Sequence, residues 1–264
     1  MKKALFIMAM LAFVATGFAQ KKLVLYFSET QTTQKVALAL QKQLSLPDKA
    51  VVAIELVEPY TGNMMETMQR AQREKQPALK PLKAKIADYD IIFLGYPIWS
   101  GTYALPIASL LKQEDFAGKT IVPFCTFGSG GLESSMADLK KALPKATIKP
   151  GYGVRQARVA SATKELDRFL KENGYVAGKV KALPAYSAQQ PVTDAEKAIF
   201  DAACSSYQFP LGTPQTFGKR TTDDSIDYEF KVKSLGFGGG GESTIYVTMG
   251  KEAGAKPEFT RVVR

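Results

Sequence analysis

The sequence predicts a doubly wound α/β fold, in which helices cover both faces of a parallel sheet, followed by a small α+β unit. Two patterns predict it. Between residues 20 and 178, five short apolar segments alternate with segments of helical periodicity, which is typical of a parallel sheet. After residue 191, a helical segment precedes segments in which apolar and polar residues alternate, as they do in antiparallel strands.

Residues 1–19 are predicted to be a secretory signal peptide rather than part of either unit. Lys2 and Lys3 precede the apolar stretch Ala4–Thr16, which is too short to span a bilayer comfortably, and small residues favour cleavage after Ala19. No cysteine follows the cleavage point, so a lipoprotein anchor is not expected. We therefore expect a secreted protein, of the bacterial periplasm, without a stable membrane anchor once the signal is cleaved. An uncleaved N-terminal membrane anchor is the alternative.

The apolar segments of residues 20–178 are expected to be the strands of the parallel sheet. They are Leu23–Phe27, Val51–Ile54, Tyr89–Leu94, Thr120–Cys125 and a segment within Thr147–Val154. Several are apolar throughout, as strands covered on both faces are. Helices are expected after the first strand, over Ala104–Leu111 and Leu132–Leu143, and beyond Ser161, which can cap a helix.

The remainder of the chain is predicted to be a linker and a second unit. Residues 179–191 are rich in Ala, Pro, Ser and Gln, as linkers are, and residues 192–264 form the α+β unit. Thr193 and Glu196 make a capping box at the start of its helix. Three alternating segments are expected as antiparallel strands: Tyr228–Lys233, Thr244–Met249 and Glu258–Val263. The pattern assigns no role to this unit.

Composition limits the chemistry. The chain has 35 lysines and arginines against 25 acidic residues, and cleavage of the signal leaves 33 against 25, a net charge of +8. Such a charge favours anionic ligands, but the lysines are scattered, so nucleic acid is not expected. There is no histidine, which excludes Ser-His-Asp catalysis and imidazole metal ligands. Cys125 and Cys204 fall in different units, and their pairing is left open.

Three unusual segments follow the first, third and fourth predicted strands. Because the carboxyl ends of parallel strands meet at one edge of the sheet, we expect one site there. The first segment places hydroxyl groups at a helix N-terminus, where backbone N–H groups favour an anion such as phosphate. The second offers a rigid aromatic wall, and the third lets a ligand approach the backbone at its glycines. They are Ser28–Thr33, Gly95–Tyr103 and Thr126–Gly131.

These three segments resemble the flavin-contacting loops of the flavodoxin-like superfamily, and in particular a bacterial branch with a Pro-Ile-Trp loop. Leu23–Ala37 is similar to the signature in which a strand feeds a hydroxyl-rich phosphate loop. Gly95–Gly101 and Gly118–Gly128 are similar to the next two loops, and the likeness covers residues 21–178. The resemblance implies a flavodoxin-like five-stranded sheet of strand order 2-1-3-4-5 and an FMN cofactor.

The resemblance also implies which residues contact the cofactor, and it implies no catalytic side chain. Hydroxyl and amide groups of the first loop would hold the FMN phosphate, at Ser28, Thr30, Gln31, Thr32 and Thr33. The family usually has Gly-Asn where this chain has Gln31-Thr32. Two further sets would contact the isoalloxazine ring: Pro97, Ile98, Trp99 and Ser100, then Thr126, Phe127, Gly128, Gly130 and Gly131.

Taken together, these features predict an exported FMN-binding protein that acts in electron transfer or as a small flavin-dependent reductase. Its partner would be a redox protein or a small-molecule electron donor or acceptor. A flavin-free binding protein on the same scaffold is the alternative, favoured by Gln31 and by export in an unfolded state. A hydrolase using Ser28 or Ser129 would lack a histidine partner. The sequence does not predict the oligomeric state.

Overall fold

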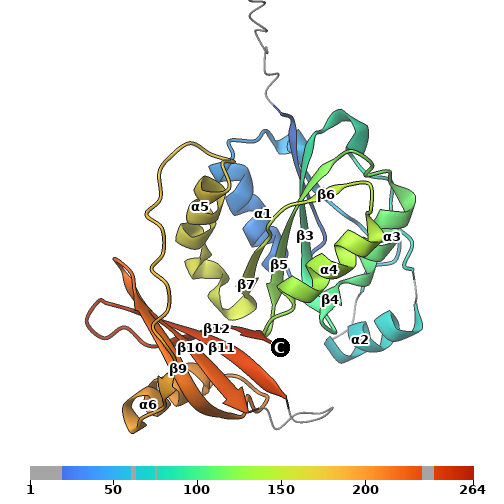
Figure 1. The fold of residues 1–264 in the computed structure, drawn as a ribbon. Coiled ribbons are helices and arrows are strands. Elements are labelled where there is room, and N and C mark those ends of the chain that lie inside the picture. The colour runs from blue at the N-terminus through green and yellow to red at the C-terminus, as the bar shows by residue number, and fades with distance from the viewer. Residues whose placement is uncertain (1–19, 61–63, 75, 234–240) are drawn as a thin grey trace, which may run out of the picture.

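The computed structural model describes residues 20–264 apart from residues 61–63, 75 and 234–240, so the predicted signal peptide lies outside the described residues. It contains two sheets, one built on parallel strands and one antiparallel (Figure 1). Within the part of the chain that is described, no helix has the length and apolar character needed to cross a membrane.

The first sheet has the order β2-β1-β3-β5-β6, and every neighbouring pair along this path is parallel. Its strands are β1 (Lys22–Tyr26), β2 (Val51–Ala53), β3 (Ile91–Trp99), β5 (Thr120–Phe127), β6 (Thr147–Ile148) and β7 (Tyr152–Arg155). Since β4 (Thr102–Tyr103) is only a short antiparallel partner of β3, this order confirms the predicted one. The predicted fifth strand is split into β6 and β7, both paired with β5, because Pro150 between them has no N–H for the ladder.

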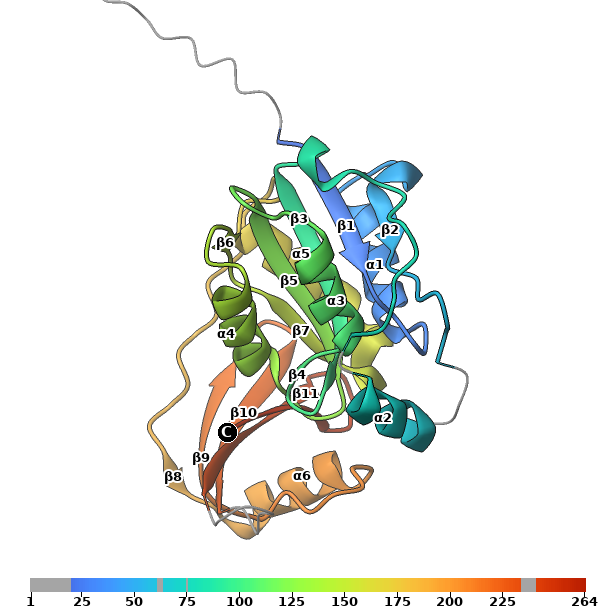
Figure 2. The same ribbon diagram turned by 90° about the vertical axis from the view of Figure 1, so that its right-hand side faces the viewer.

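Helices cover both faces of this sheet, as predicted (Figures 1 and 2). They are α1 (Thr32–Gln43) and α5 (Ala162–Glu172) on one face, and α3 (Leu105–Gln113) and α4 (Leu132–Ala142) on the other. Alternate residues of one strand enter opposite cores: Leu23 and Leu25 belong to one, Val24 and Tyr26 to the other. Burial on both faces explains why the strands are apolar throughout.

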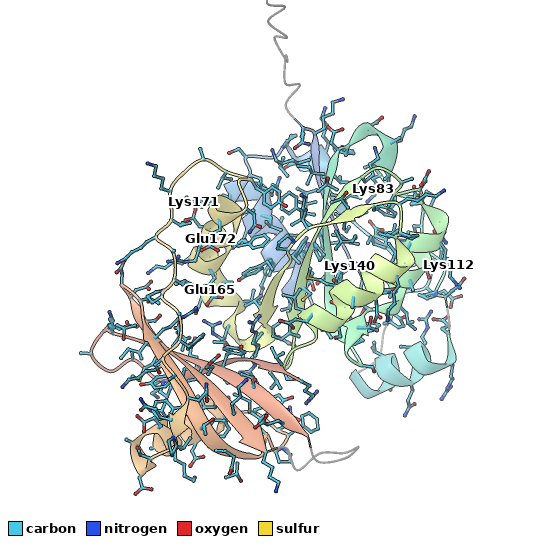
Figure 3. All side chains as sticks on the ribbon, in the orientation of Figure 1. Lys83, Lys112, Lys140, Glu165, Lys171 and Glu172 are labelled. Carbon is cyan, nitrogen blue, oxygen red and sulfur yellow. The ribbon has the colours of Figure 1, made fainter. Side chains whose placement is uncertain are left out.

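Further helical elements connect these strands and helices. They are α2 (Met64–Arg73) and the 3₁₀ helices η1 (Asp48–Ala50), η2 (Ile86–Asp88) and η3 (Gln156–Ser161). In Figure 2, α2 lies near the carboxyl ends of the strands, away from the layers that cover the sheet. Labelled charged side chains such as Lys112, Lys140 and Glu172 extend outward from their helices in Figure 3, as expected for solvated faces.

The second sheet forms the C-terminal unit, in the antiparallel order β12-β11-β10-β9-β8. Its elements are β8 (Gln190–Pro191), α6 (Asp194–Cys204), β9 (Thr213–Thr221), β10 (Ser225–Lys233), β11 (Glu242–Gly250) and β12 (Glu258–Val263). Phe200 and Ala203 of α6 pack on one apolar face of the sheet, which confirms the predicted α+β architecture. Two strands were not predicted: β9, and β8 within the segment assigned to the linker.

The C-terminal unit lies against the carboxyl end of the parallel sheet, below β5 and β7 in the view of Figure 1. The last strand, β12, is its edge strand on that side and contacts β7. The same end of the parallel sheet carries the three segments singled out in the sequence.

Candidate functional site

The first loop leaves β1 and turns sharply at Gln31 into α1. Gln31 has φ 60° and ψ 1°, a left-handed conformation that glycine adopts without strain. The Ser28 hydroxyl accepts a hydrogen bond from the Gln34 amide at 3.2 Å, and the Lys35 amide donates to the Gln31 carbonyl at 3.0 Å. The loop therefore has a tight turn at the position where the family that it resembles usually has glycine.

The hydroxyl groups of this loop fall into two sets. Thr30 and Thr32 have their Oγ1 atoms 3.0 Å apart near the surface, at the N-terminus of α1, where an anion is favoured. Thr33 is only 1% exposed, and its Oγ1 lies 2.8 Å from that of Thr126 on β5. Thr33 and Thr126 thus fasten the first loop to the third segment, although both were predicted to contact a ligand directly.

The second segment is a β-hairpin rather than the predicted loop. Pro97, Ile98 and Trp99 are the end of β3, and Ile98 and Trp99 pair with β4. The two turn residues, Ser100 and Gly101, have φ values of 51° and 85°, as a two-residue turn of type I′ requires. Strand pairing, rather than the proline and glycines alone, makes this segment rigid.

Trp99 lies at the centre of a small aromatic cluster. Its ring centroid is 5.8 Å from that of Phe27, which precedes the first loop, and 5.4 Å from that of Tyr60. Both contacts are edge-to-face, an arrangement that fixes ring orientation. Tyr60 follows β2 and was not predicted as a site residue, because a lone tyrosine in a polar segment carries no distinctive pattern.

The third segment begins inside β5, where Thr126 and Phe127 are buried, and continues through a glycine-rich turn into α4. Gly131 has φ 111°, and a Cβ there would lie 2.7 Å from Cγ2 of Ile98. The hydroxyl group of Ser134 donates to the carbonyl of Gly101. The second and third segments therefore pack directly on each other.

These contacts bring all three segments to one corner at the carboxyl edge of the sheet. Thr33–Thr126 joins the first to the third, Phe27–Trp99 joins the first to the second, and Ile98–Gly131 joins the second to the third. The exposed or half-exposed predicted residues of the corner are Ser28, Thr30, Gln31, Thr32, Pro97, Ile98, Trp99, Ser100, Gly128, Gly130 and Gly131, whereas Thr33, Thr126 and Phe127 are buried beneath them.

A pocket of about 300 Å³ opens beside the first loop, with Ser28, Glu29 and Tyr60 among its lining residues. The Tyr60 side chain is buried, and its hydroxyl has no hydrogen-bond partner among the described residues. A buried hydroxyl without a partner is costly, so it suits a bound polar group. The first loop thus offers the hydroxyl groups of Thr30 and Thr32, which bond each other, and the rings of Phe27 and Tyr60 line the pocket beside it, features that suit a phosphate and a flat ring. Among the described residues, the lining of this pocket includes neither Trp99 nor the third segment.

Charge near the pocket is mixed. Partial burial raises the pKa of the Glu29 carboxyl, and nearby Arg70 opposes that rise. The Arg70 guanidinium lies 4.9 Å from the Tyr60 ring centroid and donates to the Pro59 carbonyl at 2.9 Å. Arg70 therefore holds the segment that carries Tyr60, and burial raises the pKa of the Tyr60 hydroxyl, which stays protonated at neutral pH.

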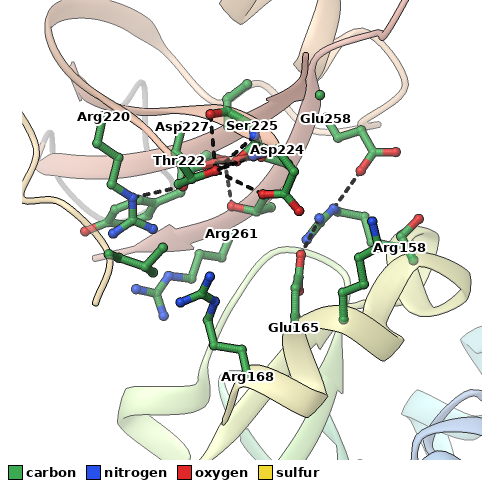
Figure 4. A pocket seen from close by; sticks show the side chains of 18 of the residues that line it. Arg158, Glu165, Arg168, Arg220, Thr222, Asp224, Ser225, Asp227, Glu258 and Arg261 are labelled. Atoms are coloured by element: carbon green, nitrogen blue, oxygen red, sulfur yellow. Dashed lines mark hydrogen bonds and ion pairs between the residues drawn. The ribbon is translucent and has the colours of Figure 1, made fainter. Parts of the chain in front are cut away.

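A larger cleft, of about 860 Å³, lies between α5 and the polar face of the antiparallel sheet (Figure 4). Its charged groups largely satisfy one another: Arg158 bonds Glu165 and Glu258, and Arg220 bonds Asp227. Among the described residues, its lining includes none from the three converging segments. We therefore place the candidate site at the corner and not in this cleft.

The two cysteines are free thiols, Cys125 buried in β5 and Cys204 half-buried in α6. Burial raises the pKa of both, in the case of Cys204 to about 12. Neither thiol is therefore an activated nucleophile.

The family model described as flavodoxin matches residues 21–172. No curated protein matches the chain. A candidate flavoprotein from Bacteroides eggerthii is 28% identical over 56% of this chain and 98% of its own, with a TM-score of 0.46. A candidate flavoprotein from Bacteroides uniformis is 26% identical over 56% and 97%, with a TM-score of 0.49.

A flavoprotein from Lactobacillus acidophilus, solved in complex with FMN, is 21% identical over 54% of this chain and 98% of its own, with a TM-score of 0.46. All three likenesses cover little more than half of this chain.

Proposed function

Because the chain belongs to the flavodoxin family, we propose that it is an exported FMN protein that transfers electrons between redox partners. The family match supports FMN as the cofactor, and it spans all three segments of the corner. Bound FMN supplies the redox chemistry, and the protein supplies binding, orientation and electrostatics.

Different residues of the corner would contact different parts of FMN. Thr30, Thr32 and the N-terminus of α1 would hold the phosphate, since hydroxyl groups and the helix dipole favour an anion there. Trp99 would form one wall of the ring slot, and the backbone of the third segment would contact the polar edge of the ring. The Tyr60 hydroxyl, which has no partner among the described residues, would donate a hydrogen bond to the ligand.

The convergence of the three segments is the observation that carries this proposal. A phosphate-binding loop and an aromatic wall can bind one flavin nucleotide only when they lie next to each other. The 2.8 Å contact of Thr33 with Thr126 and the packing of Phe27 on Trp99 hold these parts of the corner side by side.

The flavin-free alternative draws on Gln31, which replaces the glycine usual in this family. The backbone at Gln31 nevertheless keeps the left-handed turn, so the loop retains the shape that glycine would give it. This supports the FMN-binding function over the alternative.

An FMN titration of the purified protein tests the proposal, with quenching of flavin fluorescence as the readout. We expect the wild type to bind FMN and Thr30→Ala to bind about tenfold more weakly, because a hydrogen bond to a charged group is lost. Trp99→Ala should bind more weakly and quench less. Thr147→Ala, an exposed threonine on β6, is the control and should match the wild type. A wild type that does not bind FMN would establish the flavin-free alternative.

Export and electron transfer are tested separately. We expect the mature protein in the periplasmic fraction to begin at Gln20. The basic net charge favours an acidic redox partner, and such a reaction should slow as salt screens the attraction. Rapid turnover of NADH with a quinone by the loaded protein alone would instead assign it to the small reductases. The chain lacks a dinucleotide-binding glycine motif between a strand and a helix.

A further inference from the structure

The last strand of the C-terminal unit docks on the third segment of the candidate site. The Val262 amide donates to the Ser129 carbonyl at 2.7 Å, and Gly130 forms a parallel bridge with Val262. A Cβ on Gly130 would lie 2.2 Å from the Val262 carbonyl oxygen, so only glycine permits this approach. The outer edge of β12 is thus used to hold a turn of the other unit.

Arg155, at the end of β7, holds the same turn from the opposite direction. Its Nε donates to the Gly128 carbonyl at 2.8 Å, and its Nη1 donates to the Phe259 carbonyl at 2.9 Å. The guanidinium stacks 4.2 Å from the Phe259 ring centroid, and the residue is only 8% exposed. Because a buried charge must be satisfied by such contacts, Arg155 ties the turn to β12.

Two ion-pair contacts complete the junction between the units. Arg261 of β12 lies 3.2 Å from Glu133, in the first turn of α4. Arg158 lies between Glu165 of α5 at 2.6 Å and Glu258 of β12 at 2.9 Å, as Figure 4 shows. The turn of residues 128–131 is therefore held by contacts with β7 and β12, since its carbonyl groups at Gly128 and Ser129 accept bonds from Arg155 and Val262.

We propose that the C-terminal unit is part of the flavin site, because β12 and Arg155 hold residues 128–131 in the conformation that receives the flavin. This inference rests on the proposed FMN-binding function. Arg155 and Val262 are positioning residues, since they act through the turn. Coupling of this kind is reciprocal, so bound FMN must strengthen the docking of β12 by the factor by which docking strengthens FMN binding.

The first experiment measures FMN affinity and the visible absorption and circular dichroism of bound flavin in variants of the full chain. Gly130→Ala pushes β12 away without changing the core, and Arg155→Met removes both donors. We expect FMN binding to weaken about tenfold or more in each, with an altered flavin spectrum, and Arg155→Lys to recover part of the affinity. Arg168→Met is the matched control, because Arg168 bonds only Glu172 and Lys181 among the described contacts.

The second experiment uses the wild type alone and so does not depend on a variant that folds. Hydrogen exchange of the Val262 amide, which bonds Ser129, is measured with and without saturating FMN. We expect FMN to slow this exchange, and Gly130→Ala to speed it.

The outcomes separate the two proposals. A wild type without FMN affinity overturns the proposed function and this inference with it. Two results together would overturn this inference alone. In the first, wild type, Gly130→Ala and Arg155→Met bind FMN with equal affinity. In the second, the exchange rate of the Val262 amide is the same with and without FMN. If Arg155→Met does not fold, Gly130→Ala and the exchange measurement decide.

Discussion

Gln31 adopts a backbone conformation that is unfavourable for a residue with a side chain. Its φ of 60° places an L side chain in a strained region, and Ser45 at the other end of α1 has a similar φ of 52°. Gln31 lies in the candidate phosphate loop, whereas Ser45 lies far from it along the helix. Glycine substitutions at Gln31 and at Ser45 can therefore be compared to separate the effect of backbone strain on stability from its effect on ligand binding.

We expect Gln31→Gly and Ser45→Gly each to raise the free energy of unfolding by up to about 1 kcal/mol, because glycine relieves the left-handed strain. FMN affinity should stay within about twofold of wild type in both, since the backbone at Gln31 is already in the left-handed conformation that glycine favours. Thermal and denaturant unfolding give the stability, and FMN titration gives the affinity. A tenfold gain in affinity confined to Gln31→Gly would show that Gln31 distorts the free loop.

For individual residues, the sequence predicted which residue types line the candidate site better than it predicted which contacts each of them makes. It pointed to a hydroxyl-rich loop, but the turn at Gln31 sets the orientation of α1 and thereby sends Thr33 inward to Thr126. That pairing joins positions 33 and 126, and no local pattern encodes it. Tyr60 and Arg155 were missed for the same reason, because their partners are distant in sequence.

Among the elements, β3 and β5 are packed most tightly where Gly95 meets Phe124. A Cβ on Gly95 would lie 2.1 Å from Cζ of Phe124, which pairs with it in the ladder. The strand can pass this ring only because residue 95 has no side chain, and the hairpin that carries Trp99 continues directly from it.

We expect Gly95→Ala to lower the free energy of unfolding by about 1–3 kcal/mol, the usual cost of overpacking a core. Combining it with Phe124→Leu should recover part of the loss, because the smaller side chain vacates the contact. Gly128→Ala is the control, since a Cβ there meets no atom within 4 Å. Denaturant unfolding measures all of them, and equal stability of Gly95→Ala and wild type would contradict the packing argument.

The order of the parallel sheet was predictable because its strands are apolar on both faces and alternate with helices. Strand β9, Thr213–Thr221, was not, since its burial is irregular and it carries Pro214 and Gly218, both unusual within strands. The Pro-Ile-Trp segment was predicted as a loop because proline and glycine suggest one, whereas pairing with β4 makes it a hairpin.

For the molecule as a whole, Arg158 is one of the charged residues that bridge the two units, and it lies at the large cleft. Its side chain is mostly buried, whereas Glu165 and Glu258 are each partly exposed. Removal of the arginine therefore leaves two carboxylates that water can still reach, which limits the cost.

We expect Arg158→Met to lower stability by about 1–3 kcal/mol and to make the two units unfold less cooperatively, because the bonds that join them are weakened. Differential scanning calorimetry should show a broadened or split transition. Arg168→Met removes only the hydrogen bonds to Glu172 and Lys181 among those of the described residues, and it should keep the wild-type profile. An unchanged transition in Arg158→Met would mean that other contacts alone couple the units.

The bond between Ser129 and Val262 joins residues that are more than a hundred positions apart in the chain. In the export that we propose, the turn emerges on the far side of the membrane well before the strand that completes it. Until that strand arrives, the turn lacks its outer support, and the nascent chain has no finished pocket for the proposed nucleotide. On this proposal, cofactor insertion is a late event in maturation, and it depends on a supply of the nucleotide in the compartment where the protein folds.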